Sequence, residues 1–251
     1  AVCPRVLPLL GRRVRAVAFD TPGYGASARP PHDGFEIPDY AAVLARAMEG
    51  LGIERPVLGG VHTGASIAIE AAHALTGGAA GLVLSGVALF TPEERADYLA
   101  NWTPPLPVDD EGGQFAWAVA RYRRIWPGLS AEMLHLAVVE LLRAGEAYDW
   151  GYRAAFRHDP AEALRTAPAP VLLLDAEHDL LADKDAVALE LRPDAELVVL
   201  EGLPGQPHLR APERYADEIL AFVDRVADQV AGRAADRPAP QAGPPPGDGG
   251  R

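Results

Sequence analysis

The chemistry in this sequence centres on a histidine in a turn flanked by glycines. Residues 60–64 read Gly-Val-His-Thr-Gly and span the end of an apolar run at 55–61. Glycines at this spacing permit a sharp strand-to-helix turn, where larger side chains would clash with neighbouring backbone. His62 is therefore predicted at the tip of a rigid bend. An imidazole has a reference pKa of about 6.5, so it can give or take a proton near neutral pH.

Thr63 offers the other chemistry at this turn. Its amide N–H lies at the predicted N-terminus of the next helix, where it can stabilise a developing oxyanion. Its hydroxyl is an alternative nucleophile, but this choice places Val61 and Ala65 where the glycines should be, and valine is too large. His62 as a covalent nucleophile has little advantage over activation of water, because an acyl-imidazole is labile.

Two more candidates follow later apolar runs. Asp179 ends the short turn Ala-Glu-His-Asp after the run VLLLD, and it either partners a catalytic base or only caps its loop. His208 precedes the last predicted helix, and it either serves in catalysis or lies at the surface or behind the site. No two histidines have metal-ligand spacing near a carboxylate, so we predict no metal site and no cofactor.

Short apolar runs alternate with helical patterns along the chain. The runs predict buried strands at residues 13–20, 55–61, 81–87, 171–177 and 196–202. Helices are predicted at 39–52, with Asp39 as the N-cap and Gly50 or Gly52 as the stop, at 62–75, and from residue 211 onward. This alternation predicts an α/β fold, a mostly parallel sheet with helices on both faces.

Residues 91–166 interrupt the alternation with a helical block. Its first helix has a capping box at Thr91 and Glu94, and a later helix begins at a Ser130 cap. We expect a helical cap inserted after the third predicted strand. Its aromatic side chains, including Trp117 and Trp150, are expected to cover a pocket for an apolar or aromatic substrate.

Composition limits the partners and the compartment. The chain has 251 residues, of which 49% are hydrophobic, and 35 acidic residues against 23 basic ones. This acidic balance argues against nucleic acid or an anionic membrane as the main partner. The single cysteine and the absence of a signal or membrane-spanning pattern favour the cytoplasm. We expect a small-molecule substrate, and a homodimer is left open.

The predicted domains follow from these patterns. Residues 1–90 and 167–231 form the core, residues 91–166 form the cap, and residues 232–251 form a Pro/Gly-rich tail that should be disordered.

Four segments of the chain resemble the α/β-hydrolase fold superfamily. The run AVAFDTPGYGASARP is similar to the family's strand and loop D-x-P-G-x-G-x-S, and PVLGGVHTGASIAIEAA is similar to its nucleophile elbow G-x-S-x-G with the helix that follows. PVLLLDAEHDLL resembles the strand that delivers the acid. ELVVLEGLPGQPHLRAPERY resembles the segment that delivers the histidine. The segments stand in the family's order across residues 13–224.

The resemblance implies an unusual site. His62 aligns with the nucleophilic serine, Asp179 with the acid, and Gly205 with the catalytic histidine, while His208 aligns with a later, often structural histidine. An ordinary Ser-His-Asp triad therefore cannot be assembled. His208 is left as an alternative catalytic histidine, if its loop is shorter here than in the family. We predict that His62 fills the space at Gly205 and meets Asp179 directly or through water. Asp179 then fixes the tautomer and stabilises the imidazolium.

The resemblance also implies strands that this sequence lacks. AVCPRVLPLLGR is similar to the helix after the family's third strand, so the family's opening strands and an oxyanion-hole loop are not visible. The third of those strands would lie between 13–20 and 55–61. We therefore expect a fragment or truncated reading frame, and a sheet that either leaves this slot empty or pairs 13–20 directly with 55–61.

The predicted function is a cofactor-free hydrolase acting on a small hydrophobic or aromatic substrate. His62 is the base or nucleophile and Asp179 its partner, and by resemblance the reaction is hydrolysis. The same pair suits a lyase step or carbon–carbon bond cleavage. A ligand-binding pseudoenzyme on the same fold is the non-catalytic alternative.

Overall fold

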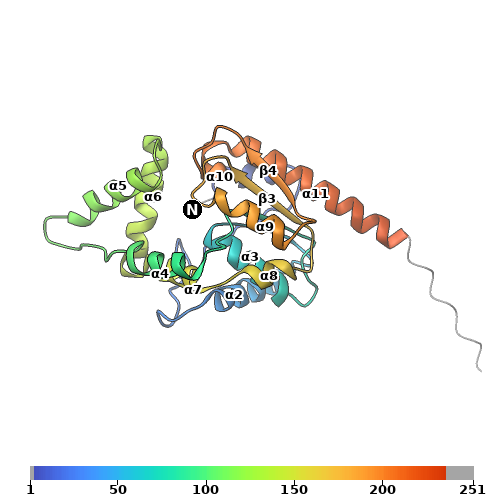
Figure 1. Cartoon of the computed structure of the whole chain (residues 1–251), viewed down its shortest axis with the longest axis horizontal. Coiled ribbons are helices and arrows are strands. Elements are labelled where there is room, and N and C mark those ends of the chain that lie inside the picture. The colour runs from blue at the N-terminus through green and yellow to red at the C-terminus, as the bar shows by residue number, and fades with distance from the viewer. Residues whose placement is uncertain (1–2, 236–251) are drawn as a thin grey trace, which may run out of the picture.

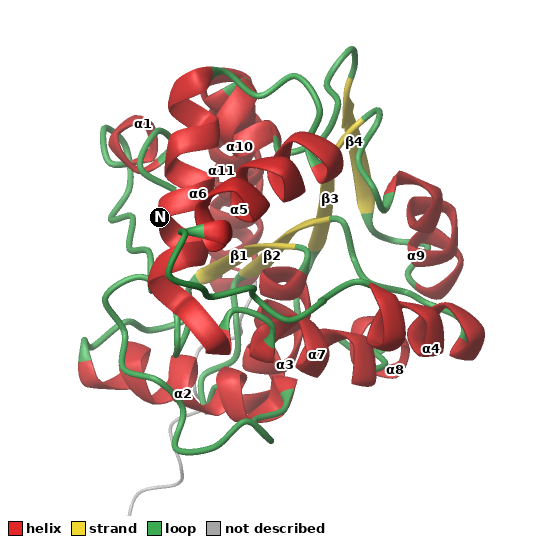
Figure 2. Ribbon diagram, turned by 90° about the vertical axis from the view of Figure 1, so that its left-hand side faces the viewer, coloured by secondary structure: helices red, strands yellow, loops and turns green. Residues whose placement is uncertain are grey.

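A parallel sheet of four strands runs through the centre of the protein (Figure 2). The computed structural model describes residues 3–235, and the strands lie in the order β1 (Val57–Val61), β2 (Gly81–Ser85), β3 (Val171–Ala176) and β4 (Glu196–Leu200). Every residue of β2 and β3 is buried, as parallel strands covered on both faces must be. The predicted α/β class with a parallel sheet is confirmed.

Alternating side chains of the central strands build two separate cores. Leu82, Leu84 and Leu173 belong to one core, which also contains side chains of α2 (Ile37–Gly50) and α3 (Thr63–Ala74). The intervening residues of the same strands face the opposite layer and form the second core, among them Val83, Leu172 and Leu174. The two-residue period of a strand produces this division.

Helices cover both faces of the sheet (Figures 1 and 2). With α2 and α3, the first face carries α8 (Ala161–Arg165) and α9 (Asp185–Leu191), which contribute to the first core. On the second face, α11 (Pro212–Ala235) contributes Tyr215, Phe222 and Val226. The remaining short elements of the core are α1 (Leu7–Leu10), η2 (Ala182–Lys184) and α10 (Pro207–Arg210).

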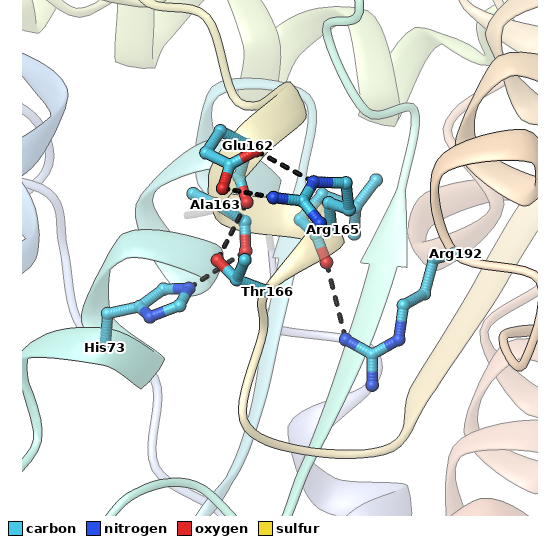
Figure 3. A network of polar contacts seen from close by, with 7 residues as sticks. His73, Glu162, Ala163, Arg165, Thr166 and Arg192 are labelled. Carbon is cyan, nitrogen blue, oxygen red and sulfur yellow. Dashed lines mark hydrogen bonds and ion pairs between the residues drawn. The ribbon is translucent and has the colours of Figure 1, made fainter.

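Polar contacts fasten α8 to its neighbours (Figure 3). His73 Nε2 of α3 donates to the Ala163 carbonyl at 2.9 Å, and the Arg192 guanidinium, just after α9, donates to the Leu164 carbonyl at 3.4 Å. Thr166 Oγ1 donates to the Glu162 carbonyl at 2.8 Å and closes the end of the helix. These bonds hold the chain where it enters β3.

Residues 92–157 form a helical insert between β2 and α8. It comprises α4 (Pro92–Asn101), α5 (Gly113–Ile125), α6 (Ala131–Ala144), η1 (Gly145–Ala147) and α7 (Trp150–Arg157). In Figure 1, α5 and α6 stand apart from the layers around the sheet. The predicted caps are present, since Thr91 and Glu94 form a capping box and Ser130 Oγ accepts from the Met133 N–H.

The predicted strand at 13–20 is wrong. Residues 15–20 have no regular structure, and Val17 and Phe19 remain 42% and 37% exposed. An apolar run becomes a strand only when a neighbouring backbone pairs with it, and β1 has no strand partner on its outer edge among residues 3–235. The slot is therefore left empty, as the first of the two alternatives expected. The insert consequently follows the second strand of the sheet, not the third.

Several predicted boundaries shift in the structure. The N-cap of α2 is Glu36, and Asp39 lies three residues on, where its carboxylate accepts from the Glu36 N–H at 2.9 Å. At the other end, α11 continues to Ala235, past the predicted start of the tail at residue 232. The rest of that predicted tail lies outside the described residues. Within residues 3–235, no helix is both long and apolar enough to cross a bilayer.

Candidate active site

The turn between β1 and α3 holds His62 in a strained backbone conformation. Its φ is 50° and its ψ −112°, a combination that side-chain-bearing residues rarely adopt. Gly60 makes the turn feasible, because a Cβ there would lie 2.0 Å from the Gly64 carbonyl oxygen. The His62 N–H donates to the Ser85 carbonyl at 2.8 Å, which ties the bend to the end of β2. The sharp bend expected from the glycine spacing is present.

His62 and Asp179 contact each other across the end of the sheet. His62 Nε2 lies 2.8 Å from Asp179 Oδ1, although 117 residues separate the two in sequence. The side chain of Asp179 is 2% exposed and that of His62 is 25% exposed. The carboxylate is therefore buried behind a ring that solvent can reach.

The environment of Asp179 decides which nitrogen of His62 is available. Burial raises the pKa of Asp179, but the His62 hydrogen bond and the N–H groups of Leu181 and Gln206 outweigh burial and hold this pKa below its usual value. An ionised carboxylate only accepts hydrogen bonds, so His62 Nε2 is the donor. The lone pair of the neutral ring is then on Nδ1, and Nδ1 is the atom that can take a proton.

Gly86 and Gly205 leave the space that the His62 ring and its partner occupy. A Cβ on Gly86 would lie 2.4 Å from His62 Cδ2 and 3.2 Å from Asp179 Oδ1. A Cβ on Gly205 would lie 3.1 Å from Asp179 Oδ2. The open space at Gly205 was predicted from the sequence, whereas the need for a glycine at position 86 was not. The signal for Gly86 was a glycine directly after the buried strand β2.

Replacing Gly86 with alanine is expected to lower any turnover at this site by roughly 10²-fold, because displacing a catalytic group by about 1 Å has an effect of this size. The matched control is Gly78→Ala. Gly78 also has a positive φ (68° against 64° for Gly86), but no atom lies within 4 Å of its added Cβ. Gly78→Ala should lose stability only through its positive φ, whereas Gly86→Ala also meets the His62 ring, and urea unfolding of both variants confirms that each remains folded. Equal loss of turnover in both would contradict the steric role of Gly86.

A second pair of carboxyl groups lies behind Asp179. Asp175, near the end of β3, is 1% exposed and hydrogen-bonds to the half-buried Asp185. Burial, together with the negative charges of Asp185 and Asp179, raises the pKa of Asp175 to about 9, although the Gly86 N–H donates to it. Asp175 is therefore protonated at neutral pH. No sequence pattern indicated this pair.

Asp175→Asn is expected to weaken the fall in the free energy of unfolding between pH 7 and pH 9. Between pH 7 and 9 the folded chain retains a proton on Asp175 that the unfolded chain has lost, so stability falls as pH rises, by up to about 1.4 kcal/mol per unit. Asparagine keeps the donor without titrating. The measurement is the urea midpoint at pH 7 and pH 9, with the exposed Asp217→Asn as control. An unchanged pH dependence in Asp175→Asn would contradict this assignment.

His208 is buried beside the pair but does not join it. It lies in α10, is 3% exposed, and packs its ring edge-on against Tyr215 at 6.2 Å between centroids. Burial, followed by the nearby His62, lowers the pKa of His208 to about 3. It makes no hydrogen bond to His62 or Asp179, and its Nδ1 has no partner in the described chain. His208 is therefore a neutral ring next to the site.

The three other predicted site residues are Thr63, Trp117 and Trp150, and of these only Thr63 adjoins His62. Thr63 begins α3, so its N–H has no partner within the helix and remains available beside His62. Trp117 packs in the core of the insert, 5.7 Å from Tyr148 between ring centroids, and Trp150 begins α7. Neither tryptophan has a ring contact or hydrogen bond with His62 or Asp179.

Two surface hollows also lie elsewhere. One is on α4 and the other is beside α5 and α6, and neither is lined by His62 or Asp179. Among residues 3–235, no group of three or more His, Cys, Asp or Glu side chains is arranged to hold a metal ion.

Comparison with known proteins identifies related sequences and folds. The sequence pattern of the group described as "Alpha/beta hydrolase family" matches residues 3–219. The structure of E-2-(acetamidomethylene)succinate hydrolase is similar, with 25% identity, a TM-score of 0.67, and 88% of this chain and 87% of that chain covered. No curated protein matches the sequence.

Two further solved structures share the fold at lower identity. A hydrolase from Pseudomonas aeruginosa PA01 has 18% identity and a TM-score of 0.70, with 86% of this chain and 82% of that chain covered. A thermophilic esterase from Thermogutta terrifontis has 20% identity and a TM-score of 0.67, with 89% and 86% covered. At these identities the likeness shows the fold alone.

Proposed function

Because this chain belongs to the alpha/beta hydrolase family, we propose that it hydrolyses esters or related acyl compounds with a His62–Asp179 pair in place of a Ser-His-Asp triad. The family confirms the predicted fold and agrees with the predicted hydrolase class. The observation that carries the proposal is the 2.8 Å contact between His62 Nε2 and Asp179 Oδ1 at the strained turn. The substrate is small and hydrophobic or aromatic, as predicted from the aromatic side chains of the insert.

The proposed reaction uses His62 as a general base. Nδ1 takes a proton from water while the water oxygen attacks the substrate carbonyl carbon, and Asp179 stabilises the resulting imidazolium. The carbonyl oxygen becomes an oxyanion that accepts a hydrogen bond from the Thr63 N–H at the start of α3. The intermediate then collapses, the bond to the leaving oxygen breaks, and Nδ1 returns its proton to that oxygen. One water is consumed, and an acid and an alcohol are released.

The geometry favours a base over a nucleophile at position 62. Nε2 is engaged with a buried carboxylate, so only Nδ1 can react. An acyl group on that nitrogen would be labile and would have to form beside the strained backbone. Activation of water requires only that the proton be exchanged, which a ring 25% exposed to solvent permits.

A serine-directed reagent tests this proposal against ordinary family chemistry. The chain should hydrolyse 4-nitrophenyl acetate yet carry no label after incubation with a fluorophosphonate, as judged by intact mass. His62→Ala should strongly lower the turnover, because it removes the base that contacts Asp179. A label on Thr63 would replace the proposed base with a hydroxyl nucleophile. Absence of turnover with every activated ester would favour the non-catalytic binding protein.

The partner and compartment belong to the same proposal. A small-molecule substrate, a cytoplasmic location and activity without a cofactor remain predictions from the sequence. Retained turnover after exhaustive dialysis against a chelator is the expected result for an enzyme that uses only His62 and Asp179.

A further inference from the structure

Arg121 is a buried cation surrounded by aromatic rings. It lies on α5 and is 4% exposed. Its guanidinium carbon lies 5.8 Å from the ring centroid of Trp102 and 5.7 Å from those of Trp117 and Tyr148. At these distances all three rings attract the charge. We call these four residues the arginine box.

The edge of the guanidinium is not satisfied within the described chain. Nη1 donates to the Trp102 carbonyl at 2.9 Å, but Nη2 is buried and has no hydrogen-bond partner. No carboxylate in residues 3–235 forms a salt bridge with Arg121, although the chain has 35 acidic residues. Arginine is almost never fully buried without a paired charge, because an unpaired buried charge is costly.

An apolar cluster connects the arginine box with the segment that holds Asp179. Trp102 packs against a cluster that contains Phe90, Phe156 and Leu181. The N–H of Leu181 donates to Asp179 Oδ1 at 3.0 Å. Trp102 of the arginine box therefore packs against the cluster that contains Leu181, the residue whose N–H binds Asp179.

Two of the three rings around the guanidinium are partly exposed. Trp102 and Trp117 are partly exposed, whereas Tyr148 is buried and its hydroxyl donates to the Pro104 carbonyl. Arg121 therefore contacts two partly exposed rings and one buried ring. Binding at the buried Nη2 edge therefore requires that one of these tryptophan side chains rotate.

We propose that the arginine box binds a carboxylate group of the substrate. This inference rests on the proposed function, since the bound molecule is taken to be the compound hydrolysed at His62. A guanidinium presents parallel N–H groups that match a carboxylate, and the rings around it accept an apolar or aromatic body. The substrate class is therefore an ester or amide that carries a free carboxylate on a small aromatic or apolar frame.

The test compares an anion with its neutral analogue. Phenylacetate and phenylacetamide have the same frame, and binding of each is measured by quenching of tryptophan fluorescence and by calorimetry. Phenylacetate should bind the chain about tenfold to hundredfold more tightly, as expected for a charge-assisted hydrogen bond. Arg121→Met should reduce phenylacetate binding to the level of phenylacetamide. Equal binding of the two probes, or no binding of phenylacetate at about 10 mM, would overturn the proposal.

Two further variants separate ligand binding from a structural role. Arg124→Met removes an exposed arginine from the same helix and should leave the preference for phenylacetate unchanged. Arg121→Lys keeps the charge but not the paired donors, so it should fold and show an intermediate preference even if Arg121→Met does not fold. If Arg121→Lys changes stability but not the preference between the probes, Arg121 only supports the insert and the proposal fails.

The same binding measured in His62→Ala keeps the two proposals distinguishable. Binding needs no turnover, so the phenylacetate preference should survive this substitution. A surviving preference together with unchanged ester turnover in His62→Ala would remove the proposed function and leave the carboxylate site. Loss of turnover in His62→Ala, together with equal binding of the two probes, would keep the proposed function and remove the carboxylate site.

Discussion

His62→Ala should lower kcat/KM for an activated ester by roughly 10²-fold to 10⁴-fold, the usual contribution of a positioned general base. Alanine removes Nδ1, the only nitrogen of the ring that is free of Asp179. The elbow glycine Gly60 and the Thr63 N–H remain, so residual rate from the oxyanion contact should persist. Steady-state kinetics with 4-nitrophenyl acetate, alongside thermal unfolding to confirm the fold, measure the effect.

The control for this substitution is His135→Ala. His135 is an exposed histidine on α6, so its loss should leave turnover within experimental error. If both variants retain full turnover, the chemistry lies elsewhere and the His62–Asp179 contact is only structural. If both lose it equally, the assay reports a general effect of histidine removal, which also contradicts the assignment.

Asp179→Asn should lower kcat by roughly 10²-fold to 10⁴-fold, with KM little changed, because it puts the ring in the wrong tautomer. The asparagine amide can donate to Nε2, which moves the ring proton to Nδ1 and removes the lone pair that water requires. The substitution keeps the size of the side chain. Asp179 Oδ1 also accepts from the Leu181 N–H, so the amide orientation that donates to Nε2 removes the oxygen acceptor of that N–H.

Nitrogen NMR of the imidazole provides the readout that a purely structural role would not change. In the unmodified chain the proton should reside on Nε2, and in Asp179→Asn it should reside on Nδ1. Asp194→Asn, which alters only an exposed carboxylate paired with Arg192, is the matched control for charge. A large loss of kcat without any change of tautomer would show that Asp179 acts by another route.

Local sequence patterns predicted much of the fold and the central contact of the site. The glycines around His62 indicated the bend because only backbone without a side chain fits at Gly60. The capping box at Thr91 was equally readable, since its hydrogen bonds join residues three apart. The likeness of the 170–181 segment to the family's acid strand indicated Asp179, and the contact with His62 followed from the space at Gly205.

Features that depend on distant neighbours could not be predicted in the same way. The run at 13–20 has strand composition, but its pairing requires a partner backbone that the described chain does not provide. The protonated Asp175 results from burial and from Asp185 and Asp179 meeting in three dimensions. The sequence around Arg121 predicts an ordinary helical arginine. Its burial depends on the rings of Trp102, Trp117 and Tyr148, which come from other positions in the chain.

The glycine at position 205 has a consequence for anyone redesigning this protein. Its φ is 91°, and the carboxylate of Asp179 lies within 3.1 Å of where a side chain would begin. Installing serine at position 62 and histidine at position 205 would therefore not recreate a serine esterase. The new histidine would need a positive φ that side-chain-bearing residues rarely adopt, and its Cβ would lie too close to the Asp179 carboxylate. A successful conversion would need the loop 203–206 rebuilt as a whole.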